Sequence, residues 1–67
     1  MKFDEIVREI RQRVGYSQNQ LADELGVSFA TVNRWENGHC EPAPIAVNAL
    51  RHFCESHHID YAEFEGN

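Results

Sequence analysis

Residues 18–38 read QNQLADELGVSFATVNRWENG, and this stretch carries the strongest start and stop signals for helices in the chain. Ser17, just before it, and Gln20 have the spacing of a capping box, in which two side chains satisfy free N–H groups at a helix start. Gly26 ends that helix, because glycine adopts the left-handed conformation at little cost. Ser28, two residues later, is a second N-cap. The stretch therefore predicts two short helices joined by a tight turn.

Similar signals outline the rest of the chain. Apolar residues recur at three- and four-residue steps before the stretch, and Pro44 suits the first position of a later helix. The apolar face predicted for that later helix consists of Ile45, Ala49, Leu50, Phe53 and Cys54. The predicted helical segments are residues 5–14, 18–25, 29–37, 44 to about 57, and a short turn within 59–64. Two helices joined by so tight a turn cross at a steep angle. We expect an all-α fold, a compact bundle of four to five short helices, with residues 1–67 forming a single domain.

The composition limits the classes of protein to consider. A chain of 67 residues has room for one small core and hardly any for a deep cleft. Its apolar runs fall far short of the ~20 residues of a membrane span. The charged start, Met1 to Glu5, does not resemble a signal peptide. We expect a cytoplasmic protein without membrane contact, and two reduced cysteines.

Histidine and cysteine residues raise the question of a metal site. The candidates are His39, Cys40, His52, Cys54, His57 and His58. Their spacing fits no standard zinc arrangement, and Cys54 lies on an apolar helix face where a buried thiol is ordinary. The sequence also shows no Ser-His-Asp arrangement and no glycine-rich phosphate loop. We expect no metal, no cofactor, no small-molecule substrate and no enzymatic activity.

The net charge of −5 argues against unspecific affinity for nucleic acid, which depends on neutralising phosphates. The charge is unevenly distributed, however. Residues 1–9 carry −1, residues 10–40 carry 0, and residues 41–67 carry −4. The acidity therefore lies mainly in the C-terminal third, away from the paired helices.

The predicted helix 29–37 has two distinct faces at about 100° per residue. Val32 and Trp35 point the same way, which must be inward. The outward positions are Ala30, Asn33, Arg34 and Asn37. This outward face holds no carboxylate, although the chain is acidic. Arginine pairs with guanine and asparagine with adenine in the major groove of DNA, so the face is typical of base recognition.

Neighbouring residues extend this interpretation. Ser28 and Phe29 lie at the helix N-terminus, the end that usually reaches bases. Phe29 either touches a thymine methyl group or covers the helix junction. Gln18 and Asn19 begin the preceding helix, where free N–H groups favour a phosphate. Asn37, Gly38 and His39 can reach the opposite flank of the groove, with Asn37 and His39 as further phosphate contacts.

These residues together resemble the Cro/phage-repressor helix-turn-helix family, also called XRE-like. The matching features are Gln18 at a helix start, Ala22, Gly26 in the turn, Val32, and Trp-Glu-Asn-Gly at 35–38. With Arg11 and Gly15-Tyr16-Ser17, the resemblance covers about residues 8–38. It implies a five-helix repressor-like domain, in which Ser28, Phe29, Ala30, Asn33 and Arg34 read bases.

The resemblance further implies an ion pair between Arg11 and Glu36, which gives Glu36 a structural role. The sequence departs from the family in two respects. Many family members are basic, whereas this chain is acidic. Phe29 and Ala30 also stand where polar residues are often found, which leaves fewer hydrogen bonds for specificity.

We therefore expect sequence-specific binding of double-stranded DNA by a repressor-like transcriptional regulator that places residues 29–37 in the major groove. A homodimer through the helix 44–57 and the C-terminal segment is expected, with Tyr61 and Phe64 partly exposed. Two alternatives stay open. One is a protein–protein interaction module, such as an antitoxin-type partner-binding domain. The other is the DNA-targeting domain of a longer DNA-modifying enzyme.

Overall fold

Serine side chains cap two of the helices in the computed structural model, which describes residues 1–38 and 41–65. The Ser17 hydroxyl accepts from the Gln20 N–H at 3.1 Å, and Gly26 adopts the left-handed conformation at φ +75°. The helices within the described residues are α1 (Phe3–Val14), α2 (Gln18–Leu25), α3 (Phe29–Glu36), α4 (Pro44–Ser56) and α5 (Ala62–Glu65). This part of the chain contains no strand, so the all-α prediction is confirmed.

Two helices begin at residues other than those predicted. Helix α1 begins two residues early, because Glu5 accepts from the Lys2 N–H at 2.9 Å and Phe3 packs edge-on against Trp35. Helix α5 is also shifted, since Asp60 accepts from the Ala62 N–H at 3.1 Å and so holds the turn before it. Both shifts depend on side-chain contacts that periodicity alone does not reveal.

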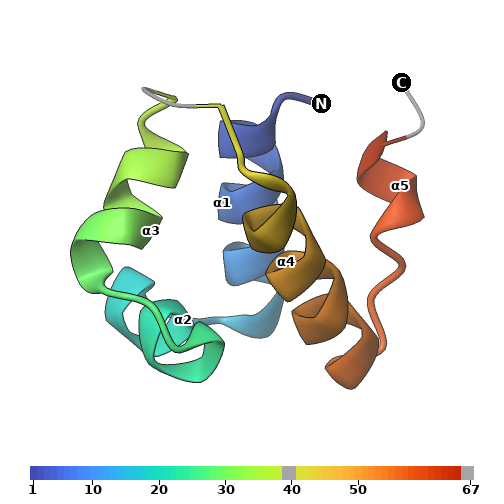
Figure 1. Cartoon of the computed structure of the whole chain (residues 1–67). Coiled ribbons are helices and arrows are strands. Elements are labelled where there is room, and N and C mark those ends of the chain that lie inside the picture. The colour runs from blue at the N-terminus through green and yellow to red at the C-terminus, as the bar shows by residue number, and fades with distance from the viewer. Residues whose placement is uncertain (39–40, 66–67) are drawn as a thin grey trace.

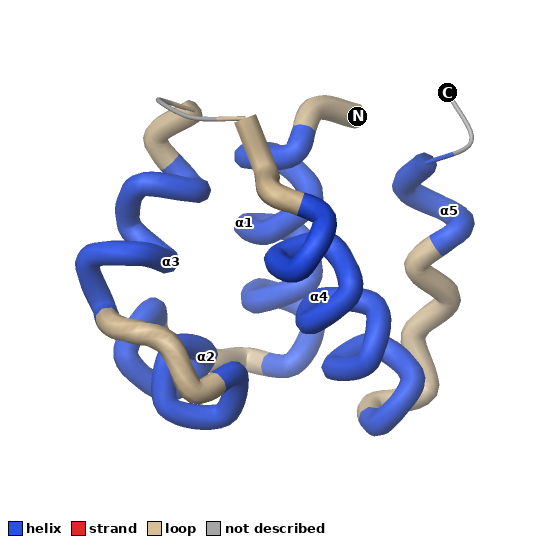
Figure 2. Tube along the Cα trace, viewed as in Figure 1, coloured by secondary structure: helices blue, strands red, loops and turns tan. Residues whose placement is uncertain are grey.

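The helices surround one hydrophobic core (Figure 1). Helices α2 and α3 lie together on one side, joined by the short loop drawn in Figure 2, and α3 packs against both α2 and α1. Helix α4 crosses in front of α1, and α5 lies on the opposite side of the molecule from α3. Val32 and Trp35 are buried, as their helical phase predicts. The outer face of α3 is consequently left free.

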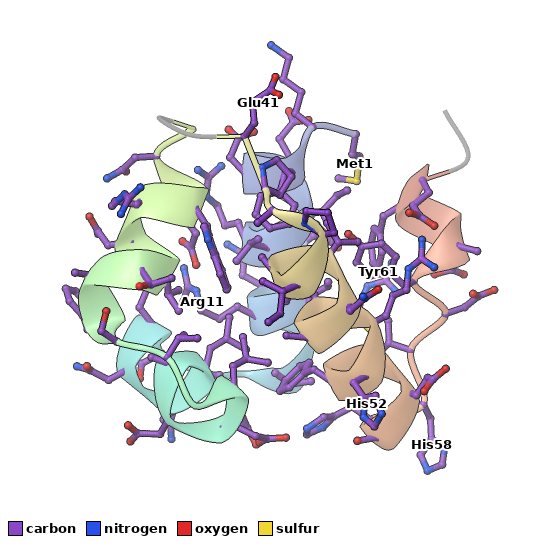
Figure 3. All side chains as sticks on the ribbon, viewed as in Figure 1. Met1, Arg11, Glu41, His52, His58 and Tyr61 are labelled. Carbon is purple, nitrogen blue, oxygen red and sulfur yellow. The ribbon has the colours of Figure 1, made fainter. Side chains whose placement is uncertain are left out.

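The C-terminal segment differs from the expectation. Tyr61 and Phe64 were expected to be partly exposed, but they are only 7% and 3% exposed. The guanidinium groups of Arg51 and Arg13 stack on their rings, 5.5 and 5.0 Å from the ring centres. Figure 3 shows Tyr61 between α4 and α5. These two aromatic residues therefore complete the core and cannot supply a dimer surface.

The prediction for Ile45 on α4 is wrong. Ile45 was placed on the buried face, yet it is 78% exposed. The buried stripe of α4 runs through Ala46, Leu50 and Phe53, at steps of four and three residues. Ile45 stands one residue, or about 100°, away from that stripe. An exposed apolar side chain thus lies at the start of α4 rather than at the C-terminal end.

The structure also bears on membrane spans, metal sites and reactive thiols. No helix in the described residues has the length and apolar character needed to cross a membrane. In the same residues, no three metal-binding side chains come together. His39 and Cys40 lie outside the described residues. Cys54 is buried, and its burial raises the pKa of the thiol to about 11, so the group is a protonated part of the core at neutral pH.

Candidate nucleic-acid interface

The carboxylate of Glu36, the last residue of α3, is buried at the junction of three segments. Glu36 is only 4% exposed. Arg11, on α1, donates from Nε to Oε2 at 2.6 Å and from Nη2 to Oε1 at 3.0 Å. Its Nη1 also donates to the Tyr16 carbonyl at 3.0 Å. The bidentate hydrogen bonding to Glu36 raises the pKa of Arg11. Through these bonds Arg11 connects α1 to the end of α3 and to the loop before α2.

Arg8 is a second arginine at this junction, and sequence reasoning missed it. Its Nη2 donates to the backbone carbonyl of Glu36 at 2.7 Å, which satisfies a free carbonyl at the end of α3. Arg8 and Arg11 are three residues apart on α1 and therefore share one helix face. That spacing is the signal that could have identified Arg8. Both arginines stabilise the fold and point at Glu36.

Three of the predicted DNA contacts are joined in a chain of side-chain amides. Gln18 donates from Nε2 to Glu36 Oε1 at 3.1 Å. Asn33 donates from Nδ2 to Gln18 Oε1 at 3.3 Å. Asn37 in turn donates from Nδ2 to Asn33 Oδ1 at 2.9 Å. Gln18 and Asn33 are half-buried and Asn37 is exposed, so this amide chain runs from the core to the surface.

The start of α3 presents a small and partly apolar surface. The Ser28 hydroxyl caps the helix by accepting from the Thr31 N–H at 3.2 Å, and it also shares a 2.9 Å hydrogen bond with the Thr31 hydroxyl. Phe29 is 47% exposed and Ala30 is exposed. Asn19 is likewise exposed in the first turn of α2. Ser28 is thus partly engaged in capping, whereas half of the Phe29 side chain faces solvent.

Arg34 is the exposed cation of α3. Four other arginines each lie within 4.0 Å of a glutamate: Arg8, Arg11, Arg13 and Arg51. In residues 1–38 and 41–65, Arg34 has no such partner. The guanidinium is therefore available to an outside acceptor. The predicted contact His39 lies outside the described residues.

A carboxylate lies close to one end of this surface. The side chain of Asp4 is next to Gly38, which directly follows the α3 cap, and a Cβ at Gly38 would meet it at 3.4 Å. Asp4 is half-buried in the first turn of α1. The surface thus carries a cation at Arg34 and a carboxylate beside Gly38.

Comparisons with known proteins agree with this geometry. Residues 7–56 match the family model described as Helix-turn-helix. A type II methyltransferase of Lactococcus lactis subsp. cremoris is 36% identical over 53 residues, which are 75% of this chain and 14% of that protein. An HTH-type transcriptional regulatory protein of Pyrococcus furiosus is 50% identical over 34 residues, covering 51% of this chain and 11% of that protein.

A third relative is closer to this chain in size. The uncharacterized HTH-type transcriptional regulator YvzC of Bacillus subtilis is 45% identical over 38 residues, which are 57% of this chain and 49% of that protein. The chain therefore spans between about a tenth and a half of the length of these curated relatives. No solved structure matches the chain significantly.

Proposed function

Since the chain belongs to the helix-turn-helix family of the Cro and phage-repressor type, we propose that it is a sequence-specific, repressor-like transcriptional regulator that reads double-stranded DNA with α3. The observation that carries this proposal is the outer face of α3. There, Arg34 is exposed and has no acidic partner in the described residues, and Asn33 and Asn37 lie beside it in the amide chain. Residues 1–67 act as one binding domain in this proposal.

The proposed complex places α3 in the major groove. Arg34 donates to the two acceptors of a guanine, and Asn33 pairs with an adenine. Phe29 supplies apolar contact to a thymine methyl group, because half of its side chain is exposed. Ser28 and Ala30 complete the set of base-reading residues. The small side chain of Ala30 lets the helix approach the groove floor.

Phosphate contacts hold the helix in register. Gln18 and Asn19 contact one strand from the start of α2, because the N-terminus of a helix favours an anion. Gln18 retains one amide hydrogen after bonding Glu36. Asn37 and His39 contact the strand on the opposite flank. These contacts add affinity without distinguishing sequences.

Two copies bind neighbouring half-sites in this proposal. The backbone extends 27 Å along its longest axis, whereas successive major grooves on one side of DNA lie about 34 Å, or ~10 base pairs, apart. Two adjacent copies therefore fit consecutive half-sites without overlap. Ile45 and the start of α4 are proposed as the homodimer surface, because Ile45 is the exposed apolar residue of that helix.

Selection of bound sequences from a random duplex pool at low salt tests the proposal. The wild-type protein should enrich a two-part site containing a guanine that is lost from the consensus of Arg34→Ala. We expect Arg34→Ala to weaken binding to the wild-type site by ~1–3 kcal/mol. Arg51→Ala, on α4, is the control for the loss of one positive charge, and circular dichroism verifies that losing its contacts with Tyr61 and Glu65 leaves the protein folded.

Two results would contradict the proposal. Failure of the wild-type protein to enrich any sequence would exclude sequence-specific recognition. Equal losses of affinity for Arg34→Ala and Arg51→Ala, with unchanged consensus sequences, would show that Arg34 contributes only charge.

The methyltransferase relative favours a second candidate function. The matched segment is only 14% of that protein, so a segment similar to this chain is also found within a type II methyltransferase. In this candidate the chain targets a larger protein to DNA. The sequence of the complete gene product, determined by peptide mass spectrometry of the native protein, separates the two: a methyltransferase domain beside residues 1–67 supports the second candidate, whereas extra length alone does not, since the regulator relatives are longer as well. A partner-binding module is the remaining alternative, and it predicts partner binding that survives Arg34→Ala.

A further inference from the structure

We propose that Glu36 is a positioning residue for base recognition. It acts through Gln18 to fix the orientation of the Asn33 amide, and this orientation determines which DNA base Asn33 can pair with. The inference rests on the proposed function, since it concerns how the same surface discriminates among sequences. Glu36 itself is buried and does not reach DNA. Its effect passes along the amide chain.

The direction of every hydrogen bond in the amide chain follows from the charge at its buried end. An ionised carboxylate can only accept hydrogen bonds. Gln18 must therefore turn its NH2 group toward Glu36, 3.1 Å away, and its oxygen toward α3. Asn33 then meets an oxygen and must present its own NH2 group, at 3.3 Å. A freely rotating asparagine has no such constraint.

The surface end of the amide chain supports the same direction. With the NH2 group of Asn33 turned toward Gln18, the Asn33 oxygen faces Asn37 and accepts from its Nδ2 at 2.9 Å. All three amides thus donate toward the buried charge. Because each amide polarises the next, the three bonds strengthen one another in the partly buried segment.

Asn33 keeps an incomplete set of partners, and this determines what it can bind. One of its two amide hydrogens is used by Gln18, and one lone pair of its oxygen is used by Asn37. One hydrogen and one lone pair are left. Adenine offers the complementary acceptor and donor on its major-groove edge, whereas guanine offers two acceptors. The fixed orientation further places the donor and the acceptor of Asn33 in one order only.

The test measures base preference at each position of the selected site for four proteins. Gln18→Met removes the link between Glu36 and Asn33 while keeping a side chain of similar length. Glu36→Gln keeps the size of the buried group but lets Gln18 turn either end of its amide toward it. Gln12→Met is the control, because Gln12 is exposed on α1 and lies outside the amide chain. Circular dichroism verifies that each variant is folded.

In the wild-type protein we expect one position to prefer adenine about tenfold, the range of a bidentate contact. Gln18→Met and Glu36→Gln should reduce that preference to about threefold or less, and Gln12→Met should leave it unchanged. A residue that only touches phosphate weakens all sequences alike when it is replaced. Uniform weakening in Gln18→Met, with the adenine preference intact, would therefore overturn the inference.

A measurement without DNA keeps the inference testable if Glu36→Gln does not fold or if the wild-type protein selects no sequence. In spectra of the 15N-labelled protein, Gln18→Met should shift the side-chain NH2 signals of Asn33 and also of Asn37, which does not touch residue 18. Unchanged Asn37 signals would overturn the relay. A selection that fails while these signals shift would refute the proposed function but retain the positioning of Asn33.

Discussion

Gly26 forms the turn between α2 and α3 with a backbone angle that other residues avoid. Its φ is +75°, and a Cβ built there would meet nothing within 4 Å. Space is thus available for a side chain, and the cost of a substitution lies in the backbone itself. The left-handed conformation costs an L-residue about 1–2 kcal/mol, with asparagine tolerated best and β-branched residues least.

Gly26→Val should therefore lower the melting temperature by about 5–15 °C, the shift that corresponds to such a loss in a domain of this size. Gly26→Asn is the control and should lose clearly less. Thermal unfolding followed by circular dichroism gives both values. Identical melting temperatures for the wild-type protein and Gly26→Val would mean that residue 26 does not adopt the left-handed conformation.

Glu36 shows how far a single residue could be interpreted from sequence. Its position next to the inward face, together with the family resemblance, predicted a pair with Arg11, and the two side chains are in contact. The hydrogen bond from Gln18 to Glu36 could not be predicted, since the two residues are 18 positions apart and lie on helices whose crossing angle the sequence leaves undefined. Residue types identified the candidates, but only the packing of α2 on α3 joined them.

At the scale of elements, Tyr16, Glu24 and His57 link α2 to the end of α4. The Tyr16 hydroxyl donates to Glu24 Oε1 at 2.6 Å, and His57 Nε2 lies 2.8 Å from Glu24 Oε2. The His57 ring also packs against Phe53, with ring centres 4.3 Å apart. The hydrogen bond from Tyr16, and then that with His57, lower the pKa of Glu24 below its ordinary value of 4.5.

A carboxyl group whose pKa is lower in the folded state stabilises the fold fully above its unfolded pKa, and this contribution disappears as pH falls through the folded pKa. Glu24→Gln should therefore lower the melting temperature at pH 7, where Glu24 is ionised. The difference from the wild-type protein should shrink as pH falls below about 4.5 and through the lowered pKa of Glu24 in the folded state. Asp23→Asn is the control, because Asp23 is an exposed neighbour outside this cluster. A difference that is constant from pH 7 to pH 3 would contradict the assigned role.

The element boundaries show which local signals were sufficient. The predicted bounds of α2 were correct, and α3 begins where predicted and ends one residue earlier. The close agreement has a local cause, because capping serines and a left-handed glycine act within a few residues. The exposure of Ile45 and the burial of Tyr61 and Phe64 were predicted wrongly. The burial of these residues depends on how α5 and the start of α4 pack against the core. The sequence alone does not show whether an apolar residue there faces the core or the solvent.

At the scale of the whole molecule, the acidic charge of α5 is separated from the outer face of α3. Two glutamates of α5 pair with arginines of other helices, Glu63 with Arg13 and Glu65 with Arg51. Helix α5 lies on the side of the molecule opposite α3 (Figure 1). A net charge of −5 is therefore compatible with DNA binding in the orientation proposed, provided that the electrostatic interaction is local.

Asp4 is an exception to this separation, because its carboxylate lies beside Gly38 at the end of α3. In the proposed complex it repels the phosphate approached by Asn37. Asp4→Asn should tighten DNA binding about twofold to threefold at low salt, because two charges some 8 Å apart in water interact by roughly 0.5 kcal/mol. The gain should decline as salt screens the repulsion, since the Debye length is about 10 Å at 0.1 M.

Glu55→Gln provides the matched control for Asp4→Asn. It neutralises one carboxylate near the end of α4, which Figure 1 places far from the end of α3. Affinities measured at several salt concentrations compare the two variants directly. If the net charge of the molecule alone limited binding, both variants would gain the same DNA affinity. Such a result would contradict a local repulsion between Asp4 and a phosphate near Gly38. A larger gain for Asp4→Asn locates the phosphate backbone beside Asn37, because only a nearby charge escapes screening.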